Sequence, residues 1–86
     1  MPAGPQPLTA LPVGQSATVL EVRGVPQHRS RLMELGLVPG TAVEVVGFAL
    51  LGDPVEVKVR GYHLTVPRQD AEQILVSGIR DCPRPS

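Results

Sequence analysis

The chain of 86 residues is poor in aromatic side chains, has one cysteine and carries no net charge. Aromatic residues make up 2% of the chain, Phe48 and Tyr62, against 42% for all apolar residues, so valine and leucine must fill any core. The lone cysteine, Cys82, excludes an internal disulfide and a zinc or iron–sulfur site built from the cysteines of one chain, which favours a reducing compartment. Zero net charge provides no overall field to attract nucleic acid or an anionic membrane.

Long hydrophobic runs are also missing. The longest uncharged apolar run, Val45 to Gly52, is far shorter than the roughly 20 residues of a membrane-spanning helix. The first residues, Met1 to Pro5, show no basic stretch followed by an apolar one, as a signal peptide would. We therefore expect a cytoplasmic protein without direct membrane insertion. A chain this short holds one domain with a thin core, because such domains bury only about 60% of the unfolded surface.

Prolines punctuate both ends of the chain, at Pro2, Pro5 and Pro7 and again at Pro83 and Pro85. Proline at this density is typical of extended tails rather than packed elements. The predicted organisation is therefore a proline-rich tail over 1–7, a domain over 8–77 and a second tail over 78–86.

Alternation of apolar and polar residues predicts a mostly β domain. The clearest strand is Val55 to Arg60, and the loop of the hairpin that follows is either Arg60-Gly61 or Gly61-Tyr62. A single helical turn is expected at Asp70 to Gln73. Five strands are predicted, at 15–22, 41–49, 55–60, 62–66 and 74–76. We expect them to curl into a small barrel, because an open sheet of this size cannot bury its apolar face.

One short helix is predicted between the first and second of these strands. Pro26 suits its first turn, and Gly36 suits its end because glycine accepts a left-handed conformation. Its apolar face should lie on the core and include Val25, His28, Leu32 and Leu35. His28 therefore reads as a partly buried structural histidine rather than a ligand. Arg29 and Met33 flank the apolar stripe, where a partner could contact them.

Turn residues separate the strands, and their backbone geometry explains them. Pro39-Gly40 suits the centre of a type II turn, with Gly40 at positive φ. Gly52, Pro54 and Gly61 mark later turns. Two leucines also lie at a turn, Leu50 and Leu51, and the sequence leaves two readings open: they tuck back to close the end of the barrel, or they stand out as an apolar docking point.

No pattern in the chain points to catalysis or nucleotide binding. The two histidines stand in no catalytic signature, and the phosphate-loop pattern GxxxxGK[ST] has no match. The possible metal ligands have no recognisable spacing: His28, His63, Asp53, Asp70 and Glu72. His63 is the weak candidate for Fe²⁺ or another divalent transition metal. Arginines at 29, 31, 60 and 68 form either a basic patch or a solvated face. Small barrels that bind single-stranded nucleic acid usually stack bases on aromatic side chains, and only Tyr62 could do so here, so no nucleic-acid partner is expected.

An ordered series of motifs resembles the FeoA family, the ferrous iron transport protein A. After the helix, the series runs Leu35-Gly36-Leu37-Val38-Pro39-Gly40, a strand, Leu51-Gly52-Asp53-Pro54-Val55, a strand, Gly61, Asp70-Ala71 and Ile74-Leu75-Val76. The resemblance covers Leu8 to Ser77. Each motif alone is only a cap or a turn, so the order carries the resemblance.

The resemblance implies an SH3-like β-barrel in the bacterial cytoplasm that is not an enzyme. It implies an adaptor that docks on the cytoplasmic GTP-binding part of a membrane ferrous iron transporter, and self-association is open. The expected docking residues are Arg29, Arg31, Met33, Leu50, Leu51 and Arg68. Pro67 stands where family members often carry a basic residue, and Arg68 is the candidate to replace it. The alternative is a metal-responsive regulatory module, like the C-terminal domain of iron-dependent repressors.

Overall fold

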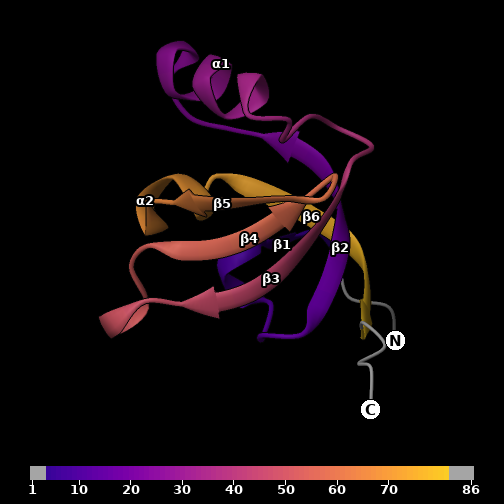
Figure 1. Ribbon diagram of the computed structural model, residues 1–86. Coiled ribbons are helices and arrows are strands. Elements are labelled where there is room, and N and C mark those ends of the chain that lie inside the picture. The colour runs from indigo at the N-terminus through magenta and orange to yellow at the C-terminus, as the bar shows by residue number, and fades with distance from the viewer. Residues whose placement is uncertain (1–3, 82–86) are drawn as a thin grey trace.

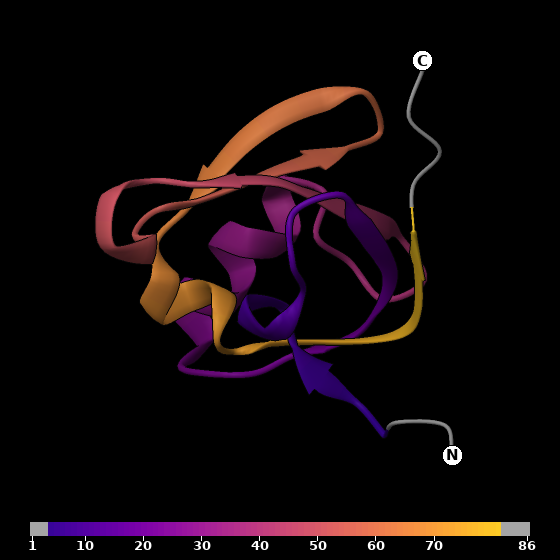
Figure 2. The same ribbon diagram turned by 90° about the horizontal axis from the view of Figure 1, so that it is seen from below.

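The computed structural model describes residues 4–81, which form one antiparallel sheet of six strands with two helices and two 3₁₀ turns. Neighbouring strands follow the order β1-β6-β2-β3-β4-β5. The sheet curls around its apolar face, and α1 lies outside it at one end (Figures 1 and 2). The elements are β1 (Gln6–Pro7), η1 (Leu8–Ala10), β2 (Gln15–Val22), α1 (Pro26–Glu34), β3 (Ala42–Phe48), η2 (Leu50–Gly52), β4 (Val55–Val59), β5 (Tyr62–Val66), α2 (Arg68–Ala71) and β6 (Ile74–Asp81).

The core is aliphatic throughout and lies on the inner face of the sheet. Strand β4 shows the rule, because its valines are at most 2% exposed while Glu56 and Lys58 between them face solvent. This alternation is the period of two expected of a strand buried on one face. The other buried side chains are Leu8, Leu11, Ala17, Val19, Val22, Leu32, Leu37, Val43, Val45, Val66, Ala71, Ile74 and Val76.

The β4–β5 hairpin has the two-residue loop Arg60-Gly61. Val59 pairs with Tyr62, and both loop residues have positive φ, 52° at Arg60 and 85° at Gly61. Positive φ at both central positions defines a type I′ turn, whose twist matches that of the flanking strands. Of the two loops left open by the sequence, the structure thus has the first.

Helix α1 ends in a Schellman motif. The Gly36 N–H donates to the Met33 carbonyl at 3.0 Å, and the Leu37 N–H donates to the Leu32 carbonyl at 3.1 Å. Gly36 has φ +102°, the left-handed region that this motif requires. The buried side chains of Leu32 and Leu37 flank the motif, so the end of α1 is fixed to the core.

The turn after α1 is tied to β2. The Thr41 N–H donates to the Val38 carbonyl at 3.1 Å, and Gly40 has φ +93°, as predicted for a type II turn. The Gly40 N–H also donates to the Val19 carbonyl at 2.8 Å. The turn therefore sets where β3 begins beside β2.

Three expectations about the sheet are wrong. It has six strands instead of five, because the two-residue β1 pairs with β6. Among residues 4–81 no pairing joins β1 to β5, so the sheet curls without closing into a barrel. With β1 counted, α1 lies between the second and third strands rather than the first and second.

The C-terminal elements also differ from the prediction. The short second helix covers 68–71 rather than 70–73, and β6 runs on to Asp81, beyond the expected end of the domain at 77. Strand pairing likewise begins at Gln6, inside the expected tail. Residues 1–3 and 82–86 of the two expected tails lie outside the described residues.

Helix α1 covers less of the core than its periodicity predicts. Of the four residues on its expected buried face only Leu32 is buried, while Val25 is 53% exposed and Leu35 43%. The His28 side chain is also 54% exposed, so the expectation of a partly buried structural histidine on the core is wrong. The sheet already fills its own interior, and only the last turn of α1 reaches it.

We expect Val57→Ala to lower the free energy of unfolding by about 2 kcal/mol, because it removes buried methyl groups and leaves a cavity. Lys58→Ala, on the exposed face of the same strand, should change it by less than about 0.5 kcal/mol. Urea unfolding of both variants measures the difference. Equal effects would contradict the assignment of the inner and outer faces.

Candidate functional site

A groove lies between α1 and the end of β2. It has a volume of about 350 Å³, and its lining includes Leu20, Val22, Met33 and Pro39. Leu20 and Met33 are 43% and 39% exposed. Arg29 stands at the same groove, and within residues 4–81 no ion pair is formed by its guanidinium. We name this feature the α1 groove. It offers an apolar floor with the Arg29 guanidinium beside it, and Glu21, whose carboxylate pairs with Arg23, also lines it.

A second exposed apolar feature is the loop η2 between β3 and β4. Leu51 stands out from it, 89% exposed, so of the two readings of this turn the structure supports the outward one for Leu51. The side chain of Leu50 lies outside what the structure describes. Figure 1 shows this loop at the end of the β3–β4 hairpin, away from α1.

Arg68 connects η2 to α2. Its backbone N–H donates to the Asp53 carboxylate at 3.0 Å. Its guanidinium lies against the loop, because a Cβ added at Gly52 would come within 2.9 Å of Arg68 Nη1. The Arg68 Nε also lies 3.8 Å from the Glu72 carboxylate. Arg68 is thus near Leu51 in space and holds the loop in place.

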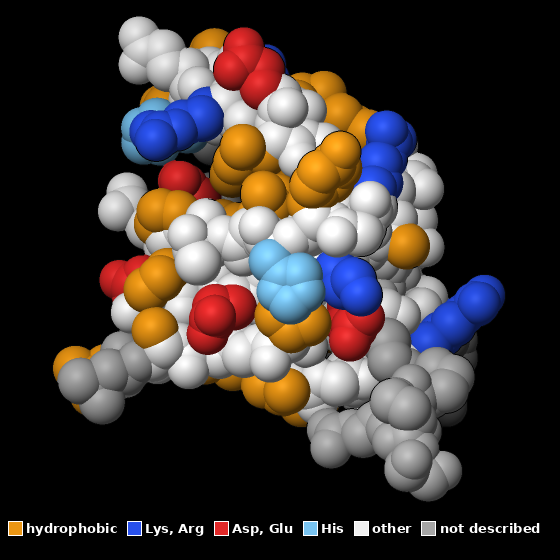
Figure 3. All heavy atoms as spheres, viewed as in Figure 1, with side chains coloured by type: hydrophobic (Ala, Val, Ile, Leu, Met, Phe, Trp, Pro, Cys, Tyr) orange, Lys and Arg blue, Asp and Glu red, His pale blue; other side chains and the backbone are white. Residues whose placement is uncertain are grey.

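The six expected docking residues therefore do not form one surface. Arg29 and Met33 share the α1 groove, while Leu51 and Arg68 belong to the η2 region. Arg31 is exposed on α1 but does not line that groove. Hydrophobic side chains gather in the hollow between α1 and the sheet, and charges of both signs are scattered over the sheet (Figure 3).

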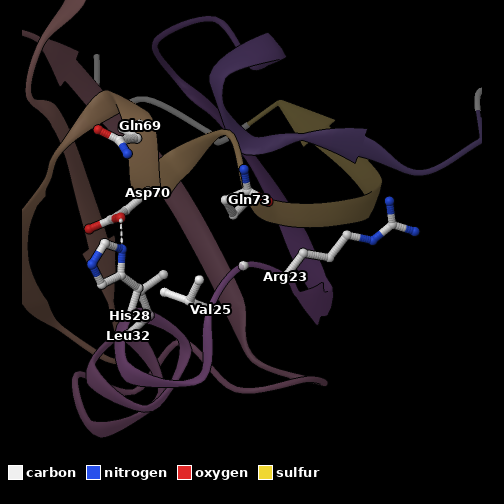
Figure 4. A pocket seen from close by; sticks show the side chains of 8 residues that line it. Arg23, Val25, His28, Leu32, Gln69, Asp70 and Gln73 are labelled. Atoms are coloured by element: carbon white, nitrogen blue, oxygen red, sulfur yellow. Dashed lines mark ion pairs between the residues drawn. The ribbon is translucent and has the colours of Figure 1, made fainter.

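A smaller cleft of about 200 Å³ separates α1 from α2, and it brings together two residues far apart in the sequence. His28 Nδ1 lies 3.6 Å from Asp70 Oδ1, as the dashed line in Figure 4 shows. This distance is too long for a hydrogen bond, so the contact is a loose ion pair when the histidine is protonated. Both residues are possible ligands by type, but nothing in the sequence indicates that α1 and α2 face each other.

The environment of His63 is poor for a metal ion. The strand register places the exposed Lys58 directly opposite it on β4, and Lys58 in turn lies opposite Glu44 on β3. An ammonium group beside a ligand repels a divalent cation. Among residues 4–81 no group of three or more histidine, cysteine, aspartate or glutamate residues is arranged to hold a metal. A metal site at His63 therefore stays a prediction, and the positive charge of Lys58 disfavours it.

None of the helices in the described part of the chain is long and apolar enough to span a membrane.

We expect Asp53→Ala to free the η2 loop from α2. Loss of the Asp53 acceptor removes a hydrogen bond to the Arg68 N–H and should cost about 1 kcal/mol of stability. Amide hydrogen exchange should show faster exchange at Arg68, whereas Glu72→Ala, which leaves this bond intact, should not change it. Unaltered exchange at Arg68 in Asp53→Ala would show that the bond does not hold the loop.

Comparison with known proteins gives a consistent family. The family model described as FeoA domain matches residues 6–78. A curated relative, the Fe(2+) transport protein A/Fe(2+) transporter FeoB fusion protein of Porphyromonas gingivalis, is 36% identical over 69 residues. The match covers 80% of this chain, which spans only 8% of that relative's length.

Solved structures agree with the family model. The FeoA protein of Chlorobium tepidum is 46% identical with a TM-score of 0.79, and the match covers 84% of this chain and 69% of that protein. FeoA of Stenotrophomonas maltophilia, a procaryotic SH3 domain protein solved with zinc, is 25% identical with a TM-score of 0.76, and the match covers 94% and 100% of the two chains.

A manganese-dependent transcriptional repressor shares the fold alone. It is 18% identical with a TM-score of 0.79 over 90% of this chain and 42% of the repressor. The sequence match over 6–78 and the shared antiparallel architecture lead to one conclusion: this chain belongs to the FeoA domain family and has its SH3-like fold.

Proposed function

We propose that this chain is an accessory protein of ferrous iron transport in the bacterial cytoplasm, which docks on the GTP-binding part of a membrane iron transporter. The observation that carries the proposal is the P. gingivalis relative, in which transport protein A and the transporter FeoB are one polypeptide. Fusion of two domains raises the effective concentration of one at the other, which favours domains that act together. The FeoA family itself is a transport-associated family and not a known family of enzymes.

The α1 groove supports this proposal as a docking surface. Its exposed floor of Leu20, Met33 and Pro39 suits the apolar face of a partner helix. Arg29 beside the floor has no acidic partner within residues 4–81 and would attract a carboxylate at the edge of that helix. The expected partner surface is therefore an amphipathic helix with an acidic residue beside its apolar stripe.

The α1 groove also has a fixed geometry. The Schellman motif at Gly36 holds the end of α1 to the core through Leu32 and Leu37, next to Met33. A groove whose walls are already ordered loses little conformational entropy on binding. We therefore expect docking without rearrangement of α1.

Met33→Asp should weaken binding to the full-length transporter, reconstituted in nanodiscs, by at least about tenfold, because it places a carboxylate on the apolar floor. The matched control is Thr65→Asp, which adds the same charge on the exposed face of β5. Biolayer interferometry measures both dissociation constants. Competition by the isolated GTP-binding part of the transporter should displace the wild-type chain.

Three results would contradict the proposal. If the wild-type chain does not bind the transporter, the accessory role is wrong. If binding occurs but the GTP-binding part does not compete, the docking position is wrong. If Met33→Asp and Thr65→Asp bind equally well, the α1 groove is not the docking surface.

A further inference from the structure

Leu51 combines two features that are each unfavourable for an isolated chain, a strained backbone and an exposed apolar side chain. Its φ is +64°, in the left-handed region that side chains with a Cβ disfavour. Its side chain is also 89% exposed, the largest value among the exposed large hydrophobic residues. Other exposed hydrophobics, such as Val13 at 45% and Leu20 at 43%, do not have positive φ. Strain of this kind persists where the surrounding structure imposes it, and it concentrates at functional sites.

The loop that carries Leu51 is closed by hydrogen bonds on both sides. The Gly52 N–H donates to the Ala49 carbonyl at 2.8 Å, and the Ala49 N–H donates to the Pro54 carbonyl at 3.0 Å. The Asp53 carboxylate and the Arg68 N–H, 3.0 Å apart, tie the same loop to α2. Leu51 is therefore held outward by the backbone around it, and its position is not the result of a loose loop.

We propose that η2 presents Leu51 as a preorganised anchor that enters an apolar pocket on the GTP-binding part of the iron transporter. This inference rests on the proposed function and adds a second contact, separate from the α1 groove. An anchor residue that is ordered before binding loses little conformational entropy in the complex. A fully exposed leucine gains the most from burial in a partner pocket.

Two other occupants fit the observations less well. The α1 groove of a second copy, at about 350 Å³, has room for a leucine, and Leu51 and this groove are different surfaces of the chain. Such a contact joins different surfaces of the two copies and need not close, so it tends toward open-ended chains. A lipid surface is also disfavoured, because the chain has no net positive charge to attract anionic lipid and the Arg68 guanidinium near the loop is already paired with Glu72.

The decisive variant is Leu51→Asn, because it should move stability and binding in opposite directions. Asparagine accepts positive φ more readily than leucine, so the thermal midpoint should rise by about 2 to 8 °C. Loss of the leucine that the transporter pocket would bury should weaken binding to the full-length transporter in nanodiscs by about tenfold to a hundredfold. Leu51→Gly should weaken binding in the same way, which guards against an effect peculiar to asparagine.

The matched control is Val13→Asn, which also replaces an exposed aliphatic residue and should bind like wild type. If the wild-type chain binds and Leu51→Asn binds equally well, the anchor is wrong while the proposed function stands. If the wild-type chain does not bind at all, the proposed function itself fails. A lower thermal midpoint in Leu51→Asn would make Leu51 a structural residue and overturn the proposal.

Two further measurements test the other occupants. Light scattering should show the same oligomeric state for the wild-type chain and for Leu51→Asn. Sedimentation with vesicles of phosphatidylcholine and phosphatidylglycerol should show no binding that depends on Leu51. A dependence on Leu51 in either experiment would replace the transporter pocket with a second copy or with lipid.

Discussion

The structure depends on burying one face of an antiparallel sheet with aliphatic side chains only. Neither aromatic residue lies in the core: Phe48 is 37% exposed and Tyr62 is 72% exposed. Valine and leucine are smaller than aromatic residues, so the sheet must curl tightly for its own inner face to fill the interior. Aliphatic residues of β2 to β6 supply most of this interior, and the helical segments add Leu8, Leu32 and Ala71.

This constraint explains why the candidate binding features lie at the periphery. Helix α1 contributes Leu32 to the core and leaves Met33, one position later, at the surface. None of the described side chains of loop η2 is buried, and the loop presents Leu51 to solvent. A domain with a self-sufficient sheet can therefore offer both an apolar groove and an apolar anchor without loss of its core.

Sequence patterns predicted the elements in which local rules and burial agree. The valine alternation of β4, the cap at Gly36 and the turn at Gly40 are all as expected, since each depends on residues close together in the chain. The two-residue β1 was missed because it contains Pro7 and has no periodicity, and it exists only through pairing with β6. The extension of β6 was missed because register shifts interrupt its pairing with β2.

The candidate site was less predictable than the fold, since it depends on distances between separate elements. Met33 and Leu51 were predicted as docking residues from the sequence, but the sequence does not indicate that they belong to different surfaces. The contact of His28 with Asp70 and the position of Lys58 opposite His63 likewise follow only from helix placement and strand register. The positive φ of Leu51 has no sequence signal, because leucine is not a residue that favours it.

Chemical-shift mapping tests the central claim, docking through peripheral apolar features, most directly. The isotopically labelled chain would be titrated with the unlabelled GTP-binding part of the transporter. The account predicts shift changes that cluster at the methyl groups of Leu20 and Met33 and at those of Leu51, with the exposed faces of β4 and β5 unaffected. Changes centred on Lys58 and His63, or none at saturating partner, would contradict it.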